Sequence, residues 1–201
     1  MGLSLLTWRR DVTAAYTAVR QATDHRAGWE AWRQRRDALF RDHPDSPLSP
    51  AARKTFKGLP FAPYDPALRF TVPVADAEPA HLDLPTATDG IVPFDRIGQI
   101  TLPDLGSLDL WWLGSYGGGL FVPVKDATAG RTTYGGGRYL LDTVKGADLG
   151  GSAEELVVDL NFAYHPSCAY DPAWACPLPP PGNLLAAEAH AGEQLPDGGW
   201  Y

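Results

Sequence analysis

The chain has 201 residues, of which 44% are hydrophobic and 20% charged, a composition that predicts one globular domain over residues 1–201 with a buried core. Its formal net charge of -7 argues against a protein that binds duplex nucleic acid through a basic face. Glycine (21 residues) and proline (19 residues) are both abundant, which favours a turn-rich β protein over a helical bundle.

Residues 1–45 show the pattern of two amphipathic helices. Apolar residues recur every three or four positions over residues 4–23, and a second helical pattern over 29–42 should end before Pro44. One side of the second helix carries Trp29, Trp32, Arg36, Leu39 and Phe40. The basic patch of Arg33, Arg35 and Arg36 is interpreted as a solvated face. Ser49 predicts the N-cap of a short helix that begins at Pro50.

The first ten residues, MGLSLLTWRR, contain too short an apolar run for a secretory signal. No window approaches the about 18 uninterrupted apolar residues of a membrane span. We therefore expect a soluble cytoplasmic protein with no membrane partner and no nucleic-acid partner. The oligomeric state cannot be read from the sequence.

Between residues 66 and 165 the hydrophobic period changes from that of a helix to the period of two that is typical of strands. The alternating runs are 68–74, 82–84, 108–112, 120–124, 139–144 and 156–162. No helical pattern separates successive runs, so parallel βαβ units are not expected. The predicted fold is mainly β (α+β): an antiparallel barrel or sandwich of about seven strands, with two N-terminal helices. Residues 166–201 are predicted to be a loop and a Pro-rich C-terminal arm packed on this core.

Polar residues concentrate on two of these runs. Asp159 and Asn161 lie opposite the apolar face of 156–162, and polar groups that point into a barrel can hold a ligand. Around three consecutive glycines, Tyr134, Arg138 and Tyr139 could hold an anion. The alternatives are surface residues on a one-sided sheet and a flexible hairpin turn.

The two cysteines, Cys168 and Cys176, follow His165 closely. This spacing leaves open a zinc clip, a disulfide, a nucleophilic thiol and two buried reduced thiols. Because Cys-x7-Cys is not a recognised zinc spacing, no metal site is predicted, and no cofactor is named. Glu188, His190 and Glu193 could form an acid/base cluster, but at this C-terminal position they are interpreted as surface residues.

Six segments of the chain form a specific pattern: HPDSPLS, FKGL, LFVPVKDATAG, RTTYGGGRYL, VVDLNFAYHPSCAYDPAWACPLPPPGN and the terminal AGE. With this pattern the chain resembles bacterial and archaeal domain-of-unknown-function family 1684, over roughly residues 29–193. The resemblance implies no reaction, because that family has no established one. Its pattern usually has Asn where this chain has His165, and Glu where this chain has Gly182. A position that reads Asn in relatives is a poor candidate for a zinc ligand or a catalytic base.

The residues that match the family pattern are more polar than core packing alone requires, which favours a ligand pocket. We expect a small-molecule-binding β-barrel and leave open whether it is an enzyme. The expected ligand-binding residues are Asp126, Tyr134, Arg138, Tyr139, Asn161 and Asn183, and the expected proton-handling pair is Asp159 and Tyr164.

Two alternatives remain at this point. In a non-catalytic protein-interaction module, the same polar residues would form buried hydrogen bonds that lock the fold. A metal-dependent hydrolase is the weaker alternative. The distinguishing observation is whether the polar residues line an open cavity or pair with each other and with the backbone.

Overall fold

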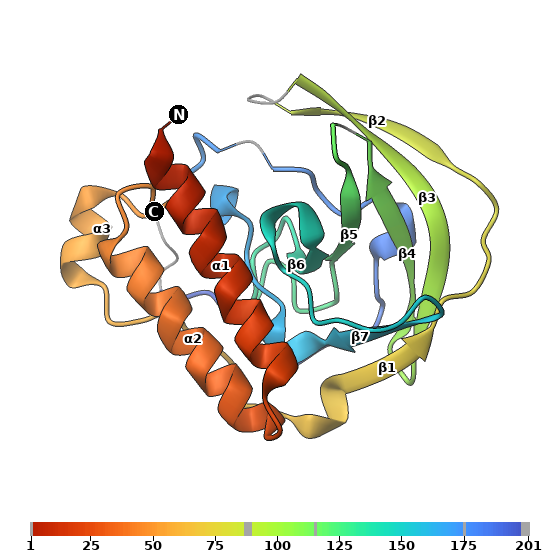
Figure 1. Ribbon diagram of the computed structural model, residues 1–201, viewed down its shortest axis with the longest axis horizontal. Coiled ribbons are helices and arrows are strands. Elements are labelled where there is room, and N and C mark those ends of the chain that lie inside the picture. The colour runs from red at the N-terminus through yellow and green to blue at the C-terminus, as the bar shows by residue number, and fades with distance from the viewer. Residues whose placement is uncertain (1, 87–89, 115, 175, 198–201) are drawn as a thin grey trace.

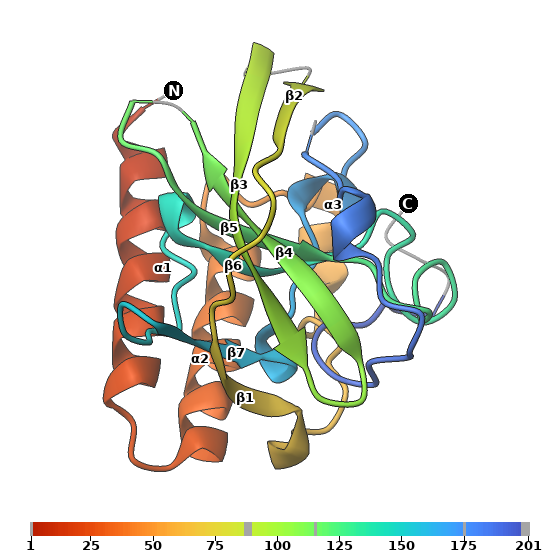
Figure 2. The same ribbon diagram turned by 90° about the vertical axis from the view of Figure 1, so that its right-hand side faces the viewer.

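The computed structural model describes residues 2–86, 90–114, 116–174 and 176–197. Helices α1 (Leu3–Gln21) and α2 (His25–Asp42) lie side by side on one flank of the molecule, and the strands occupy the other flank (Figure 1). Turning the molecule shows the helical pair standing as a layer beside the sheets (Figure 2). No helix in the described part of the chain is long and apolar enough to cross a membrane.

The helices begin and end where the local sequence favours it. The Asp24 side chain accepts a hydrogen bond from the backbone N–H of Ala27 and caps α2, which ends just before Pro44. Helix α3 (Pro50–Thr55) starts with proline after Ser49, whose side chain accepts from the N–H of Ala52. The predicted helices and the predicted cap at Ser49 are therefore confirmed.

Seven strands form two antiparallel sheets, one of five strands in the order β2-β3-β4-β5-β6 and one of two strands, β1-β7. Their bounds are β1 (Arg69–Pro73), β2 (His81–Thr86), β3 (Gly90–Leu102), β4 (Gly106–Leu113), β5 (Gly119–Val124), β6 (Arg138–Asp142) and β7 (Glu155–Asp159). The prediction of a mainly β fold with antiparallel sheets and two N-terminal helices is confirmed. The ladders of the described strands do not close into a barrel.

The longest strand, β3, was not among the predicted runs. Its apolar alternation is interrupted, because a β-bulge between Arg96 and Gly98 shifts the register against β4. Inside the last predicted run, the strand ends at Asp159 and Leu160–Phe162 form a 3-10 turn instead.

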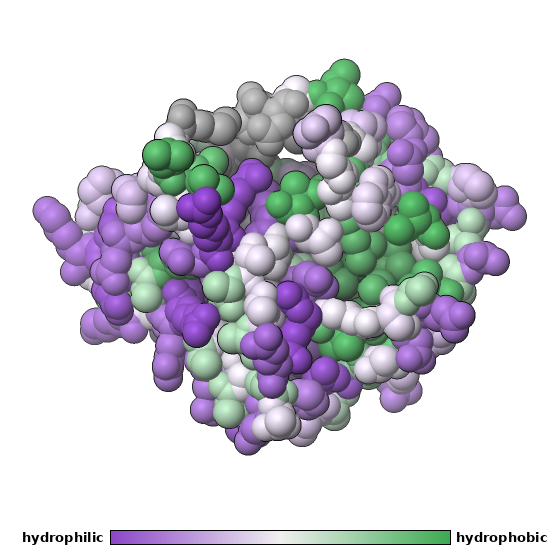
Figure 3. Space-filling view, viewed as in Figure 1, coloured by the Kyte–Doolittle hydropathy of each residue, from purple (hydrophilic) through white to green (hydrophobic). Residues whose placement is uncertain are grey.

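The hydrophobic core lies between the helical pair and the two sheets. It joins Tyr16 of α1 and Trp29 and Trp32 of α2 to strand residues such as Val122 and Leu140. On the outside, hydrophilic side chains cover α1 and α2, whereas hydrophobic ones gather over the strands (Figure 3). The C-terminal segment joins the β region through isolated bridges, Lys125 to Leu184 and Phe61 to Glu193.

Candidate functional site

A buried ion pair fixes the C-terminal segment to the start of β6. The guanidinium of Arg138 donates to the carboxylate of Asp126 and to the carbonyl oxygens of Ala189 and Ala191, and both charged side chains are 1% exposed. Burial lowers the pKa of Arg138, and the adjacent Asp126 opposes that effect. The other Asp126 oxygen accepts from the N–H and hydroxyl of Thr128. These two predicted site residues therefore pair with each other and with the backbone.

Asn183 makes a second internal contact of this kind. It is 0% exposed, and its carbonyl oxygen accepts from the indole N–H of Trp111 at 2.7 Å. Its amide nitrogen donates to the carbonyl oxygens of Asp109 and Pro123, each at 2.9 Å. The amide thus joins the C-terminal segment to β4 and β5.

Asn161 and Asp159 form a third contact at the end of β7. One Asp159 oxygen accepts from the backbone N–H and the amide of Asn161 at 2.9 and 2.7 Å, and Asn161 also exchanges two hydrogen bonds with the backbone of Asp65. The second Asp159 oxygen has no hydrogen-bond partner among the described residues, and the Arg69 Nε lies 3.8 Å away. Burial raises the pKa of Asp159. This carboxylate lines a cavity of about 380 Å³ with Arg20, His25 and Arg69.

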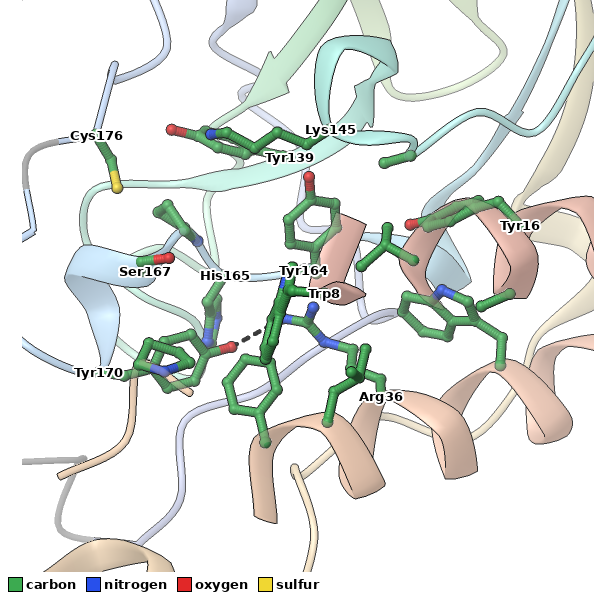
Figure 4. A pocket seen from close by; sticks show the side chains of 18 residues that line it. Trp8, Tyr16, Arg36, Tyr139, Lys145, Tyr164, His165, Ser167, Tyr170 and Cys176 are labelled. Carbon is green, nitrogen blue, oxygen red and sulfur yellow. Dashed lines mark hydrogen bonds between the residues drawn. The ribbon is translucent and has the colours of Figure 1, made fainter. Parts of the chain in front are cut away.

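A different cavity, of about 100 Å³, lies between α1, α2 and β6 (Figure 4). Its walls are largely aromatic and include Trp8, Trp32 and Phe40. Its polar side chains are Tyr16, Arg36, Tyr139, Lys145, Tyr164, His165, Ser167, Tyr170 and Cys176. Tyr139 and Tyr164 are the predicted site residues that line it. Asp159 and Tyr164, expected to act as a pair, line different cavities.

The Glu193 carboxylate anchors one wall of this cavity. It is 0% exposed, accepts from Arg36 at 3.0 Å and from the backbone N–H of His165 at 3.1 Å, and also accepts from the Tyr170 hydroxyl. Tyr170 in turn accepts from Arg36 at 3.1 Å (Figure 4). The expectation that Glu193 lies at the surface is therefore wrong.

Aromatic rings hold the Arg36 guanidinium in place. Its carbon lies 4.6 Å from the ring centre of Phe40 and 4.8 Å from that of Tyr164. Burial by itself lowers the pKa of Arg36, but the Glu193 carboxylate and neighbouring tyrosines outweigh it, so the net pKa is raised. The interpretation of this helix face as solvated is wrong for Arg36, whose side chain is 14% exposed.

His165 is a neutral ring with its proton on Nδ1. Its Nε2 accepts from the backbone N–H of Tyr134 at 3.1 Å, so that nitrogen carries the lone pair. Burial, together with the charges of Arg138 and Arg36, lowers the pKa of His165 well below the ordinary value. The Nδ1 atom lies 3.7 Å from Glu193, too far for a hydrogen bond.

Three hydrogen-bond donors of the cavity wall have no partner among the described residues: the Tyr16 hydroxyl, the Arg36 Nε and the His165 Nδ1. Burial raises the pKa of Tyr16, so its hydroxyl stays protonated. Trp32 approaches that hydroxyl as a donor, which leaves the hydroxyl proton without an acceptor. Buried groups of this kind are rare in folded proteins, and a ligand or an ordered water is the usual explanation.

Sequence reasoning missed Arg36, Tyr16 and Glu193 as site residues. The signal for Arg36 was its place on the apolar side of α2, where a basic residue needs a buried partner. The signal for Glu193 was the terminal AGE segment that carries part of the family resemblance. Neither feature of the sequence predicts that Arg36 and Glu193 form an ion pair.

The departure at Gly182 has a structural reason. A Cβ atom at this position would lie 1.9 Å from an Asp109 carboxylate oxygen. Asp109 is 3% exposed and accepts from Arg96 at 3.2 Å and from Gln99 at 3.0 Å. The Asp109 carboxylate of β4 therefore occupies the space that a side chain at 182 would need.

Both cysteines are free thiols; Cys168 is buried and Cys176 is half-buried. Among the residues with described positions, no group of three or more His, Cys, Asp or Glu side chains could hold a metal ion.

Comparisons with known proteins find relatives without an assigned reaction. A family model described as a protein of unknown function (DUF1684) matches residues 54–194. The solution NMR structure of an uncharacterised protein from Haloarcula marismortui is similar to this chain, with 35% sequence identity and a TM-score of 0.59. The similarity covers 84% of this chain and 92% of that one. No curated protein matches.

Proposed function

Because the chain belongs to the DUF1684 family, whose description names no reaction, we propose a function from the chain's own geometry. We propose that the protein binds a small compound with carbonyl-type oxygen atoms in the cavity between α1, α2 and β6. The observation that carries this proposal is that three residues with buried, unpartnered donors, Tyr16, Arg36 and His165, line the same cavity.

The three donors define what a ligand must offer. A buried donor left without an acceptor costs about 1–3 kcal/mol, so a ligand that supplies acceptors recovers that free energy on binding. The two cationic side chains of the wall are already paired, Arg36 with Glu193 at 3.0 Å and Lys145 with Asp142 at 3.4 Å. These contacts favour a short ketone or carboxylic acid over a multiply charged ion.

The size of the cavity limits the ligand further. At about 100 Å³ it is smaller than an apolar cavity of about 150 Å³ that accepts benzene. A ligand of about four or five non-hydrogen atoms fits this volume. The rings of Trp8, Trp32 and Phe40 would contact its apolar part, and the hydroxyl of Tyr164 stands beside it.

We also propose that the two sheets are arranged like a barrel and that the chain forms a single domain. Isolated bridges join Ala75 to Gln99 and Tyr139 to Tyr164, which supports a barrel-like arrangement of the two sheets around the core. The shared core of helices and strands supports one domain.

A second candidate is the interaction module in which the polar motif locks the fold. The contacts of Asp126, Arg138, Asn161 and Asn183 support the locking part of this candidate, since each pairs with other side chains or with the backbone. They carry no information about a partner surface.

Isothermal titration calorimetry tests the binding proposal. Acetate, propionate and acetone should bind the full chain, whereas methylammonium, a donor of similar size without an acceptor, should not. Tyr16→Phe should weaken binding about tenfold, which corresponds to about 1.4 kcal/mol. Tyr116→Phe is the matched control, because Tyr116 is fully exposed. Equal heats from methylammonium and the carbonyl compounds, or equal affinities in the two variants, contradict the proposal.

A further inference from the structure

The two thiols of the chain lie in contact beside the cavity. Cys168 belongs to the 3-10 turn Ser167–Ala169, and its thiol hydrogen-bonds to the sulfur of Cys176. The backbone N–H groups of Ser167 and Cys168 also donate to that sulfur. Cys176 itself lines the cavity, with its sulfur on the side of Ser167 (Figure 4).

These contacts distinguish the two sulfurs. The hydrogen bond from Cys168 lowers the pKa of Cys176 to about 6; burial opposes this effect, and the two backbone N–H groups and Lys145 reinforce it. The same contact, together with burial, raises the pKa of Cys168. The contact therefore favours the thiolate form at Cys176 and the protonated thiol at Cys168.

We propose that Cys176 is a nucleophile that reduces a small hydroperoxide, and that Cys168 then resolves the product into an intramolecular disulfide. The geometry behind this proposal is a donor-supported sulfur in the wall of a small cavity, in contact with a second thiol. It goes beyond the ligand proposal and does not depend on it, because neither thiol contributes one of the three unpartnered donors.

The chemistry balances in two steps. The Cys176 thiolate attacks one peroxide oxygen, an S–O bond forms, the O–O bond breaks, and the leaving oxygen takes a proton and departs as water or an alcohol. The product at Cys176 is a sulfenic acid. The Cys168 sulfur then attacks the Cys176 sulfur and loses its proton, and the hydroxyl leaves as water. The hydroperoxide is reduced by two electrons and the dithiol is oxidised by two.

Neighbouring groups fit both steps. The Tyr139 hydroxyl, which donates to the carbonyl oxygen of Pro177 at 2.8 Å, also interacts with Cys176 and so lies beside the reacting sulfur. The volume of about 100 Å³ admits hydrogen peroxide or a short alkyl hydroperoxide and excludes bulky ones. A disulfide of about 2.05 Å is shorter than a hydrogen-bonded contact, so the second step draws the two segments together.

The wild-type chain allows the first test. Alkylation by iodoacetamide, followed by peptide mass spectrometry, should modify Cys176 first, with a rate midpoint near pH 6 instead of the about 8.5 of a free cysteine. One equivalent of hydrogen peroxide should lower the mass of the monomer by about 2 Da, reversibly with dithiothreitol. Since the chain has 2 cysteines, an intramolecular disulfide has one possible pairing.

Two variants separate the roles. Cys168→Ser should stop at the sulfenic acid of Cys176, which dimedone traps. Cys176→Ser should leave Cys168, which is buried, slower to alkylate at neutral pH than Cys176 is in the wild-type chain. Three results overturn the proposal: first alkylation at Cys168, a Cys176 midpoint near 8.5, or disulfides found only between chains. Cys176 lines the same cavity as Tyr16, but the two readouts differ. Calorimetry compares acetate affinity in Tyr16→Phe and Tyr116→Phe and needs no reaction at sulfur, whereas alkylation and disulfide formation need no acetate, so failure of one proposal is distinguishable from failure of the other.

Discussion

Two regions of this molecule bury polar side chains of similar type but treat them differently. At the start of β6, Arg138 is paired with Asp126 and with backbone carbonyls, and no side-chain atom of either residue is buried without a partner in the described part of the chain. At the cavity, Arg36 is paired with Glu193 through one nitrogen, while its Nε has no partner. Burial of an arginine therefore does not identify a site. The proposed site is marked by several unmatched donors on residues that line one cavity.

From residue types alone, the region around Arg138 would be predicted to bind a ligand and the region around Arg36 would not. The segment around Arg138 and Tyr139 carries the polar pattern that predicted a pocket, yet Arg138 holds the C-terminal segment in place. The residues around the cavity come from α1, α2, β6 and the segment that contains His165 and Tyr170. We regard the first region as the lock and the second as the site.

The largest expected loss of stability comes from removing the buried ion pair between Arg138 and Asp126. Arg138→Met leaves the buried Asp126 carboxylate without its partner, so the free energy of unfolding should fall by about 3–5 kcal/mol. Urea denaturation measures the loss. Arg131→Met is the matched control: Arg131 is 64% exposed beside Glu188, and its replacement should cost less than about 1 kcal/mol. Equal losses in the two variants would mean that the buried pair does not stabilise the fold.

Two tyrosines of the cavity should respond differently to loss of the hydroxyl. Tyr170→Phe removes a donor to the Glu193 carboxylate and should cost about 1.5–3 kcal/mol. Tyr16→Phe removes a hydroxyl proton that has no acceptor, and with it the oxygen that Trp32 approaches as a donor, so without ligand the loss should stay below about 1.5 kcal/mol. Chemical denaturation of both variants checks this, and a large loss in Tyr16→Phe would show that its hydroxyl is already satisfied within the protein.

Close packing around Asn183 allows a third comparison. Gly182→Ala places a methyl group 1.9 Å from an Asp109 oxygen and should destabilise the fold by about 1–3 kcal/mol. Gly135→Ala is the control, because its new methyl group would meet its nearest atom at 3.7 Å. If the clash is the cause, Gly182→Ala should cost less in an Asp109→Ala background than in the wild-type chain. An equal cost in both backgrounds would assign the loss to the backbone instead.

The smallest expected effect is the pH dependence of His165. Its pKa in the folded state is lowered by burial, so the unfolded chain binds a proton that the folded chain does not as the pH falls below about 6.5. Stability should therefore decrease from pH 7.5 to pH 5, and this decrease should be smaller in His165→Asn. An Asn side chain can also accept from the Tyr134 N–H. A ring that titrates near pH 6.5 by NMR would contradict the buried neutral histidine.

Local patterns predicted much of the fold. The caps at Asp24 and Ser49, the helical periodicity before Pro44 and most alternating runs depend on neighbouring residues, which a sequence displays directly. Strand β3 was not predicted, because its bulge at Arg96–Gly98 interrupts the alternation of apolar and polar residues. The pairing of Arg36 with Glu193 joins distant parts of the chain, and no local pattern reports such a contact.

The candidate site was predictable only in part, for the same reason. Tyr139 and Tyr164 belong to polar segments of the sequence and do line the cavity. Tyr16 and Arg36 lie on helices α1 and α2, where the spacing of apolar residues predicts only core packing. That their donor atoms have no partner can be seen only in the folded structure. Polarity in a sequence shows that hydrogen bonds are needed. It does not show which of them the protein leaves for a ligand.

The most direct test of this account is a high-resolution crystal structure of the protein with acetate. We predict density for a small molecule whose oxygen atoms lie within hydrogen-bonding distance of the Tyr16 hydroxyl and at least one of Arg36 Nε and His165 Nδ1. A dry cavity, or side chains rearranged so that these three donors pair with other protein groups, would contradict the claim that they mark a binding site.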